Sequence, residues 1–313
     1  MQRVVAREKI AETERLIRPH IRRTPVVETA GEDFGVKGVA LVFKLELLQH
    51  SGSYKARGAF ANMLLRDVPK AGVAAASGGN HGAAVAYAAN RLGVAAKIFV
   101  PEISSPAKIA RIRSLGADLV IGGAVYADAL RACEKHLETS GAMSLHAFDA
   151  PETMLGAGTM ALELEQQSPG LDAILIAVGG GGLIGGSAAW HEDRTQLVGV
   201  EPENAPTLHE ALKAGRPVDV KVSGVAADSL GASRIGAHNF PIIKDRVAAS
   251  VLVADEAIVA AQKALWGRLR IAAEPGGAAA LAALMSGAWK PEKGARVGVV
   301  ICGGNTSAVR FNQ

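Results

Sequence analysis

A single lysine, Lys55, lies in the turn-like stretch HSGSYKARGAF, which covers residues 50–60. This stretch follows a strand-like run, VALVFKLEL (39–47), and opens a helical pattern. Partial burial in such a turn lowers the pKa of a lysine, and the neutral amine is then a nucleophile that can form a Schiff base. Because an isolated lysine between small residues is more often an exposed helix start, the assignment depends on the rest of the chain.

Three further turns rich in glycine follow strand-like runs: SGGNHG (77–82), VGGGGLIGG (178–186) and CGGNTS (302–307). Ligands bind at the carboxyl ends of strands in open α/β sheets, so we expect these turns to converge with Lys55 on one site. Four consecutive glycines, Gly179, Gly180, Gly181 and Gly182, open a helical run. They let backbone N–H groups approach an anion closely, which predicts a phosphate site.

A nucleophilic amine beside a phosphate site indicates a phosphorylated aldehyde, and pyridoxal 5'-phosphate (PLP) fits that description. A second interpretation stays open, because Gly180-x-Gly182-x-x-Gly185 also matches the dinucleotide fingerprint. Glu201 follows Gly180 by 21 residues, where a ribose-binding acid is expected. An NAD-dependent dehydrogenase is therefore the competing prediction, although it leaves Lys55 and the other two turns without a role.

The elements that must position these residues alternate between strand and helix, which is typical of parallel sheets covered on both faces. Strands are expected at 39–47, 72–76, 95–100, 118–121, 172–178, 196–201, 248–253 and 296–302. Helices are expected at 5–18, 57–66, 81–92, 106–115, 125–139, 153–167, 183–192, 206–214, 255–270 and 276–286.

The composition excludes several other classes of protein. With 49% hydrophobic and 20% charged residues, the 313-residue chain can bury a large core and is not expected to be disordered. The net charge of +4 is scattered and aromatic residues make up only 4%, so no nucleic-acid partner is predicted. No apolar run is long enough for a membrane span, and we expect a cytoplasmic protein. The two cysteines have no metal-ligand spacing.

The motifs resemble those of a known family. Residues 53–59, SYKARGA, resemble the S-F-K-x-R-G-A motif of fold-type II PLP enzymes, and the nearest branch is the serine/threonine dehydratase family, which includes serine racemases. SGGNHG resembles the S-x-G-N-H loop of that family, VGGGGLIGG its phosphate loop and CGGNTS its closing S-G-G-N segment. RRTPVVET (22–29) and EPGGAAA (274–280) resemble its R-T-P-L element and its late Glu-Pro segment.

The resemblance implies an α/β fold like that of the tryptophan synthase β subunit, with two parallel-sheet domains and the cofactor in the cleft between them. Residues 1–66 and 147–313 would form a large domain that binds PLP. Residues 67–146 would form a small domain that carries the loop for the substrate carboxylate. The resemblance also implies a homodimer. Because the sequence given stops at residue 313, we expect no regulatory domain.

The resemblance assigns roles residue by residue. Lys55 would hold PLP as a Schiff base and move the α-proton of the substrate. The N–H groups of Gly179 to Gly182 and Leu183 would bind the phosphate, Asn80 the ring hydroxyl and Cys302 the pyridine nitrogen. The substrate carboxylate would be bound by Ser77, Gly78, Asn80 and His81. The expected activity is that of a PLP-dependent lyase, which converts L-threonine, L-serine or a related 3-hydroxy amino acid to a 2-oxo acid and ammonia.

Four positions depart from the pattern of the family. Tyr54 replaces the usual phenylalanine, and Cys302 stands where many relatives have serine. Gly78 stands where racemases carry a second serine, and since glycine has no proton to give, we expect elimination and keep racemisation as an alternative. Thr207 replaces an aspartate that is a metal ligand in some relatives, which leaves Glu201 and Ala205 as weak candidates, so no divalent metal site is expected. An inactive amino-acid-binding protein is a third hypothesis, and the intact Lys55 argues against it.

Overall fold

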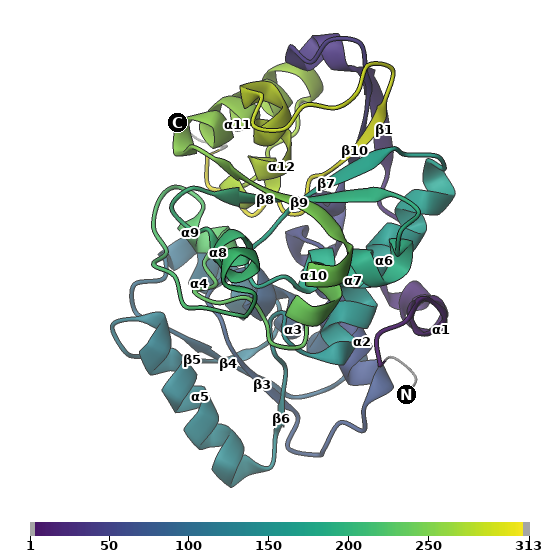
Figure 1. Ribbon diagram of the computed structural model, residues 1–313. Coiled ribbons are helices and arrows are strands. Elements are labelled where there is room, and N and C mark those ends of the chain that lie inside the picture. Colours follow the sequence, from purple (N-terminus) through teal and green to yellow (C-terminus); the bar gives the residue numbers. More distant parts are fainter. Residues whose placement is uncertain (1–3, 309–313) are drawn as a thin grey trace.

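The computed structural model describes residues 4–308 and contains two β-sheets (Figure 1). The larger sheet has six strands in the order β1 (Val26–Ala30), β2 (Ala40–Lys44), β10 (Arg296–Val300), β7 (Ala173–Ala177), β8 (Gln196–Pro202) and β9 (Val247–Val253). Only the edge pair β1 and β2 is antiparallel, and the other neighbours are parallel. Strands from both ends of the chain therefore build one sheet.

The smaller sheet is parallel throughout, in the order β5 (Asp118–Ile121), β4 (Ala96–Val100), β3 (Val73–Ala76) and β6 (Met143–Ser144). The helices that alternate with its strands are α3 (Asn80–Leu92), α4 (Pro106–Ser114) and α5 (Tyr126–Ser140). The two parallel-sheet domains that the sequence predicts are thus present. Their exact division at residues 66/67 and 146/147 stays a prediction.

The remaining helices lie outside the smaller sheet. They are α1 (Arg7–Ile17), α2 (Lys55–Leu65), α6 (Pro151–Gln167), α7 (Gly182–His191), α8 (Thr207–Ala214), α9 (Ala227–Leu230), α10 (Phe240–Arg246), α11 (Asp255–Leu269) and α12 (Pro275–Ser286). The sequence patterns predicted neither the short elements β6, α9 and α10 nor strand β1. Edge strand β1 has no fully buried residue, so its pattern lacks an apolar face.

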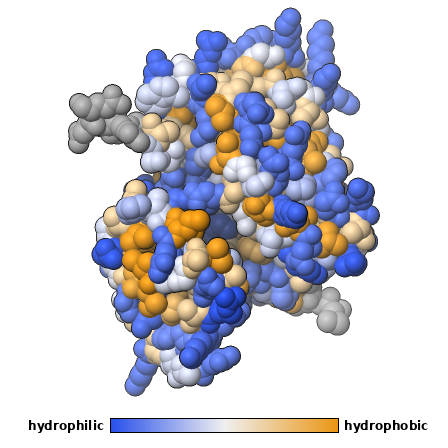
Figure 2. All heavy atoms as spheres, turned by 90° about the vertical axis from the view of Figure 1, so that its left-hand side faces the viewer, coloured by the Kyte–Doolittle hydropathy of each residue, from blue (hydrophilic) through white to orange (hydrophobic). Residues whose placement is uncertain are grey.

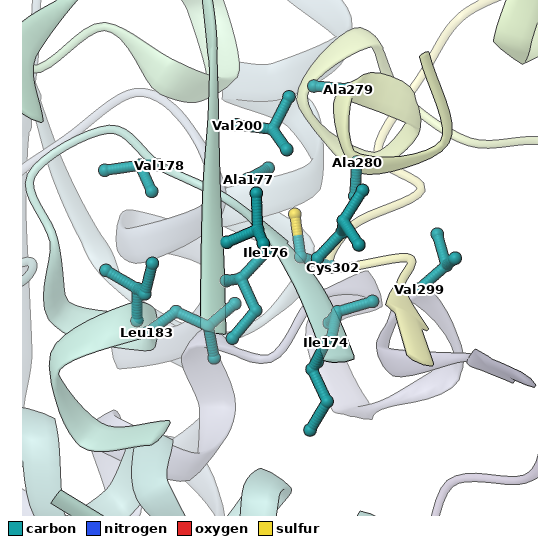
Figure 3. Close-up of a cluster of buried hydrophobic side chains, with 14 of the residues drawn as sticks. Ile174, Ile176, Ala177, Val178, Leu183, Val200, Ala279, Ala280, Val299 and Cys302 are labelled. Carbon is teal, nitrogen blue, oxygen red and sulfur yellow. The ribbon is translucent and has the colours of Figure 1, made fainter. Parts of the chain in front are cut away.

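The core of the larger sheet explains why its central strands read as continuous apolar runs. Every residue of β7 is buried, as are the last four residues of β10. Figure 3 shows Ile174, Ile176 and Val299 in this cluster, together with Cys302 just beyond the end of β10. Each fully buried Val, Leu or Ile side chain of these strands stabilises the fold by about 1.5–3 kcal/mol, so the strands that lead into the glycine-rich turns are anchored in the core. No helix within residues 4–308 is long and apolar enough to cross a membrane.

Four charged side chains are completely buried between β2, α2 and α6, and we call them the ionic cluster: Lys44, Glu46, Arg57 and Glu163. Arg57 donates to both carboxylate oxygens of Glu46, at 2.8 and 2.7 Å, and to Glu163 at 3.0 Å. Lys44 donates to Glu163 at 2.6 Å. Burial alone would raise the pKa of Glu163, but Arg57 and Lys44 hold it at about 2. The cluster thereby fixes the first turn of α2 to its neighbours.

Candidate active site

Lys55 is the first residue of α2, and the residues before it are tied to the CGGNTS turn. Ser53 forms an isolated antiparallel bridge with Gly303, and the N–H of Tyr54 donates to the carbonyl of Cys302 at 3.1 Å. The Nζ atom of Lys55 donates to the carbonyl of Ala147 at 2.6 Å. Burial lowers the pKa of Lys55 to about 8, although Cys302 and Glu274 act in the opposite direction. Part of the amine is therefore neutral near pH 7, and the role of Lys55 as the Schiff-base lysine stays a prediction.

The SGGNHG loop leads from β3 into α3. The hydroxyl of Ser77 accepts the N–H of Gly79 at 3.2 Å, and Asn80 is the first residue of the helix. The Nε2 atom of His81 lies 2.9 Å from the carbonyl of Leu145, which requires Nε2 to carry the proton. Burial and the charge of Lys55 lower the pKa of His81 to about 3, so the ring is neutral. The buried ring is thus bonded to the backbone of Leu145. Binding of a substrate carboxylate by this loop stays a prediction.

Asn80 lies between two side chains that the motif comparison left without a role, Glu274 and Asn305. Its amide donates to Glu274 at 2.5 Å, and its side-chain carbonyl accepts from Asn305 at 2.6 Å. Glu274 precedes α12, and its N–H donates to the carbonyl of Gly303 at 3.2 Å. Burial raises the pKa of Glu274 to about 7 despite the hydrogen bond from Asn80. The quoted motifs EPGGAAA and CGGNTS contained both residues, but not their contact with Asn80.

The tetraglycine turn, residues 179–182, joins β7 to α7. Gly181 has a φ of +90°, a conformation that favours glycine. A Cβ at Gly180 would lie 2.2 Å from the ring of Phe148, so packing also requires a glycine here. The first N–H groups of a helix have no acceptor within it, and those of Gly182 and Leu183 begin α7. The turn therefore offers an anion site, although phosphate binding alone does not account for all its glycines.

One short segment contacts three of these groups, and we call residues 145–148 the exit segment because they directly follow β6. Its Leu145 carbonyl lies 2.9 Å from Nε2 of His81, its Ala147 carbonyl accepts a hydrogen bond from Nζ of Lys55, and its Phe148 ring packs on Gly180. The amine, the start of α3 and the tetraglycine turn are thus brought together. The sequence gave no signal of that role, because the two-residue strand β6 that the segment follows was itself not predicted.

Cys302 completes the arrangement at the carboxyl end of β10. Its thiol is buried and lies 3.5 Å from the carbonyl of Gly276, to which it donates. Burial raises the pKa of Cys302 to about 12, with Glu274 acting in the same direction. The thiol therefore stays neutral and keeps a proton that it can donate.

These groups fit PLP chemically. Lys55 provides an amine of lowered pKa for the aldehyde, and the start of α7 provides N–H groups and a helix dipole for the phosphate. Asn80 and Cys302 provide neutral polar groups for the ring. The exit segment contacts the amine through Ala147 and the tetraglycine turn through Phe148, so both groups lie next to the same short stretch of chain.

The alternative reading of Glu201 finds no support in its contacts. Its buried carboxylate accepts the N–H groups of Leu208 at 2.6 Å and His209 at 2.8 Å, and the hydroxyl of Ser250 at 3.0 Å. Glu201 therefore caps the start of α8, and the ribose-binding acid of the dinucleotide interpretation is engaged within the chain. The carbonyl of Ala205 accepts the N–H of Thr207 at 3.0 Å. No group of three or more His, Cys, Asp or Glu side chains in the described part of the chain is arranged to hold a metal ion.

Comparison with known proteins agrees with this chemistry. The family model described as "Pyridoxal-phosphate dependent enzyme" matches residues 17–303. Phenylserine dehydratase from Ralstonia pickettii is 39% identical over 93% of this chain and 90% of its own length. A threonine deaminase from T.th. superposes with a TM-score of 0.91 at 34% identity, over 97% of this chain and all of its own. Maize serine racemase superposes with a TM-score of 0.92 at 31% identity, over 97% of this chain and 95% of its own. The chain belongs to the family of pyridoxal-phosphate dependent enzymes.

Proposed function

We propose that this protein is a PLP-dependent ammonia-lyase that converts a 3-hydroxy amino acid, such as L-threonine or L-serine, to a 2-oxo acid and ammonia. The observation that carries the proposal is the amine of Lys55, whose pKa is lowered to about 8 and which lies 2.6 Å from the exit segment. Relatives named as a dehydratase of phenylserine and a deaminase of threonine support the same reaction class.

The described residues suit each part of this reaction. When bound, PLP supplies an aldehyde that condenses with amines and an electron sink for a carbanion. Lys55 would hold it, the first turn of α7 would bind its phosphate, and Asn80 and Cys302 would bond to its ring. The N-terminus of α3, with Ser77, Gly78, Asn80 and His81, would bind the substrate carboxylate through backbone N–H groups.

The proton is then moved by a group whose pKa matches the task. The Nζ of Lys55 takes the α-proton, and a pKa of about 8 keeps part of the amine neutral at physiological pH. The β-hydroxyl leaves as water. The resulting enamine is released and hydrolyses to the 2-oxo acid and ammonia.

Racemisation is the second candidate, because serine racemases are among the similar structures. It needs a proton donor on the face of the substrate opposite to Lys55, and Gly78 provides none. A Cβ at Gly78 would lie 2.3 Å from the hydroxyl of Ser104 and 3.1 Å from Val100, so a serine does not fit without a shift. Elimination is therefore favoured, and a chiral assay that detects D-serine as the main product from L-serine would reverse this order.

Purified enzyme provides the direct test. The wild-type protein should carry a yellow absorbance band that borohydride removes, and it should release a 2-oxo acid from L-serine or L-threonine. Lys55→Ala should lose the band and lower kcat by about 10²- to 10⁴-fold. The exposed Lys37→Ala variant serves as the control and should keep both. A colourless wild-type protein that binds NADH would instead support a dehydrogenase.

Three further expectations remain proposals. A homodimer in the cytoplasm is proposed from the resemblance to the family, and light scattering of the purified protein tests its mass. The domain division at residues 66/67 and 146/147 can be tested by limited proteolysis. Absence of a divalent site is proposed because Glu201 is engaged by α8, and Mg²⁺ that restores activity after EDTA treatment would contradict it.

A further inference from the structure

Helix α4 of the smaller domain presents two cations toward the larger domain. Lys108 and Arg111 are three residues apart, so they share one face of the helix. Lys108 forms an ion pair with Asp228 of α9. The Nη2 atom of Arg111 reaches the loop before Lys55, where it lies 3.0 Å from the position that a Cβ at Gly52 would take. Figure 2 shows that the molecule is hollowed between its upper and lower parts on the side of α4 and α9.

The surroundings of Arg111 belong to the active site. The same Cβ position at Gly52 lies 2.3 Å from the side-chain oxygen of Asn305, and Asn305 donates to Asn80. The charges of Arg111 and Lys108 both act to lower the pKa of Glu274, which bonds to Asn80 on the other side. Gly52 itself has a φ of +78°, so neither its conformation nor its neighbours leave space for a side chain. The guanidinium therefore lies against the wall that holds Lys55.

The two cations differ in how their charge is balanced. Asp228 neutralises Lys108, whereas within residues 4–308 no carboxylate lies within ion-pair distance of Arg111. Arg111 is exposed, so a ligand can reach it. In the proposed function the start of α3 binds the α-carboxylate of the amino acid. The guanidinium of Arg111 is suited to a second carboxylate on the ligand, which it can bind through two parallel hydrogen bonds.

We propose that Arg111 binds a second carboxylate, carried on the β-carbon of the substrate, so that the preferred substrates are dicarboxylic 3-hydroxy amino acids, of which 3-hydroxyaspartate is the simplest. This inference rests on the proposed ammonia-lyase function. In the reaction the Cα–H and Cβ–O bonds break and water leaves. Water is then taken up again and ammonia is released, so that one 3-hydroxyaspartate gives one oxaloacetate and one ammonia without oxidation or reduction.

Three variants of the holoenzyme test the proposal: Arg111→Gln, Arg111→Lys and, as the matched control on the same helix, the exposed Arg113→Gln. Loss of a charged hydrogen bond is expected to lower kcat/KM for 3-hydroxyaspartate by about 10- to 100-fold in Arg111→Gln. Arg111→Lys should retain part of the activity. The same variants should change kcat/KM for L-serine by no more than about twofold, because a neutral β-substituent makes no ion pair. Arg113→Gln should match the wild type on both substrates.

A binding measurement provides a second readout. Calorimetry of the holoenzyme should show that malate binds more tightly than lactate, which lacks the second carboxylate, and that Arg111→Gln removes this difference. The proposal is overturned if the wild type prefers L-serine to 3-hydroxyaspartate, or if Arg111→Gln loses activity equally on both or selectively on an aromatic substrate. Failure of the proposed function looks different, because no hydroxy amino acid would then be turned over by the wild type.

Discussion

Two polar clusters share helix α2, and they are built in opposite ways. Arg57 points into the ionic cluster, in which every charge is completely buried and has an opposite charge in contact. Lys55, two residues earlier, belongs to what we call the amine cluster: Lys55, Asn80, Glu274 and Cys302. Here the lysine and the glutamate have no direct ion pair with each other, and burial moves both pKa values toward neutrality, to about 8 and about 7.

The difference separates a structural use of charge from a chemical one. In the ionic cluster, Arg57 and Lys44 outweigh desolvation and keep Glu163 ionised, so its charge does not change near neutral pH. In the amine cluster the effect of desolvation on the pKa values exceeds the effect of the neighbouring groups. Lys55 and Glu274 therefore titrate near physiological pH. A rigid set of paired charges thus holds the helix that presents a titratable amine.

The largest effect should come from breaking the ionic cluster. Glu163→Gln removes the charge that Arg57 and Lys44 share, and it should lower the free energy of unfolding by about 3–5 kcal/mol, measured by urea denaturation at pH 7. The control is Glu165→Gln two residues on, whose side chain is 30% exposed and pairs with Arg7. It should cost about 1 kcal/mol or less. An equal decrease in the free energy of unfolding of the two variants would show that the buried ion pairs stabilise the fold no more than the exposed one.

Glu274 of the amine cluster should make the free energy of unfolding fall as the pH rises, whereas Glu163, whose pKa is lowered, makes it fall as the pH drops. The pKa of Glu274 rises from 4.5 to about 7 on folding, so its contribution to stability is complete below pH 4.5 and is lost as the pH passes 7. Wild-type protein should therefore lose up to about 3 kcal/mol relative to Glu274→Gln between pH 4 and pH 8. Denaturation of both proteins across that range measures the difference. A constant difference would mean that Glu274 titrates normally.

The smallest effect concerns the amine itself. The rate at which apoenzyme takes up PLP should rise with pH through about 8, because only the neutral form of Lys55 attacks an aldehyde. Since the charge of Glu274 raises the pKa of Lys55, Glu274→Gln should move this midpoint to lower pH by less than about one unit. Stopped-flow absorbance gives the profile. A midpoint near pH 10.5 in the wild type would contradict the lowered pKa and would show that the amine of Lys55 is solvated.

The fold and the reactive groups could be predicted from the sequence where one residue or one local pattern suffices. The apolar runs of β7 and β10 and the lysine at the start of α2 are local signals of this kind. The contacts of Asn80 with Glu274 and of Lys55 with Ala147 join residues 194 and 92 positions apart, and no local pattern reports them. The packing of Phe148 on Gly180 is likewise a tertiary contact, so the steric reason for that glycine could not be foreseen.

The exit segment has a consequence for protein engineering. Residues 145–148 follow the last strand of the smaller sheet, yet they contact the amine of Lys55 and the tetraglycine turn of the larger domain as well as α3. A chimera that grafts the smaller domain of a relative onto this chain should therefore join the two parents directly after residue 144. A junction after residue 148 would replace these contacts in the candidate active site by those of the relative, and such hybrids should fold but bind PLP poorly.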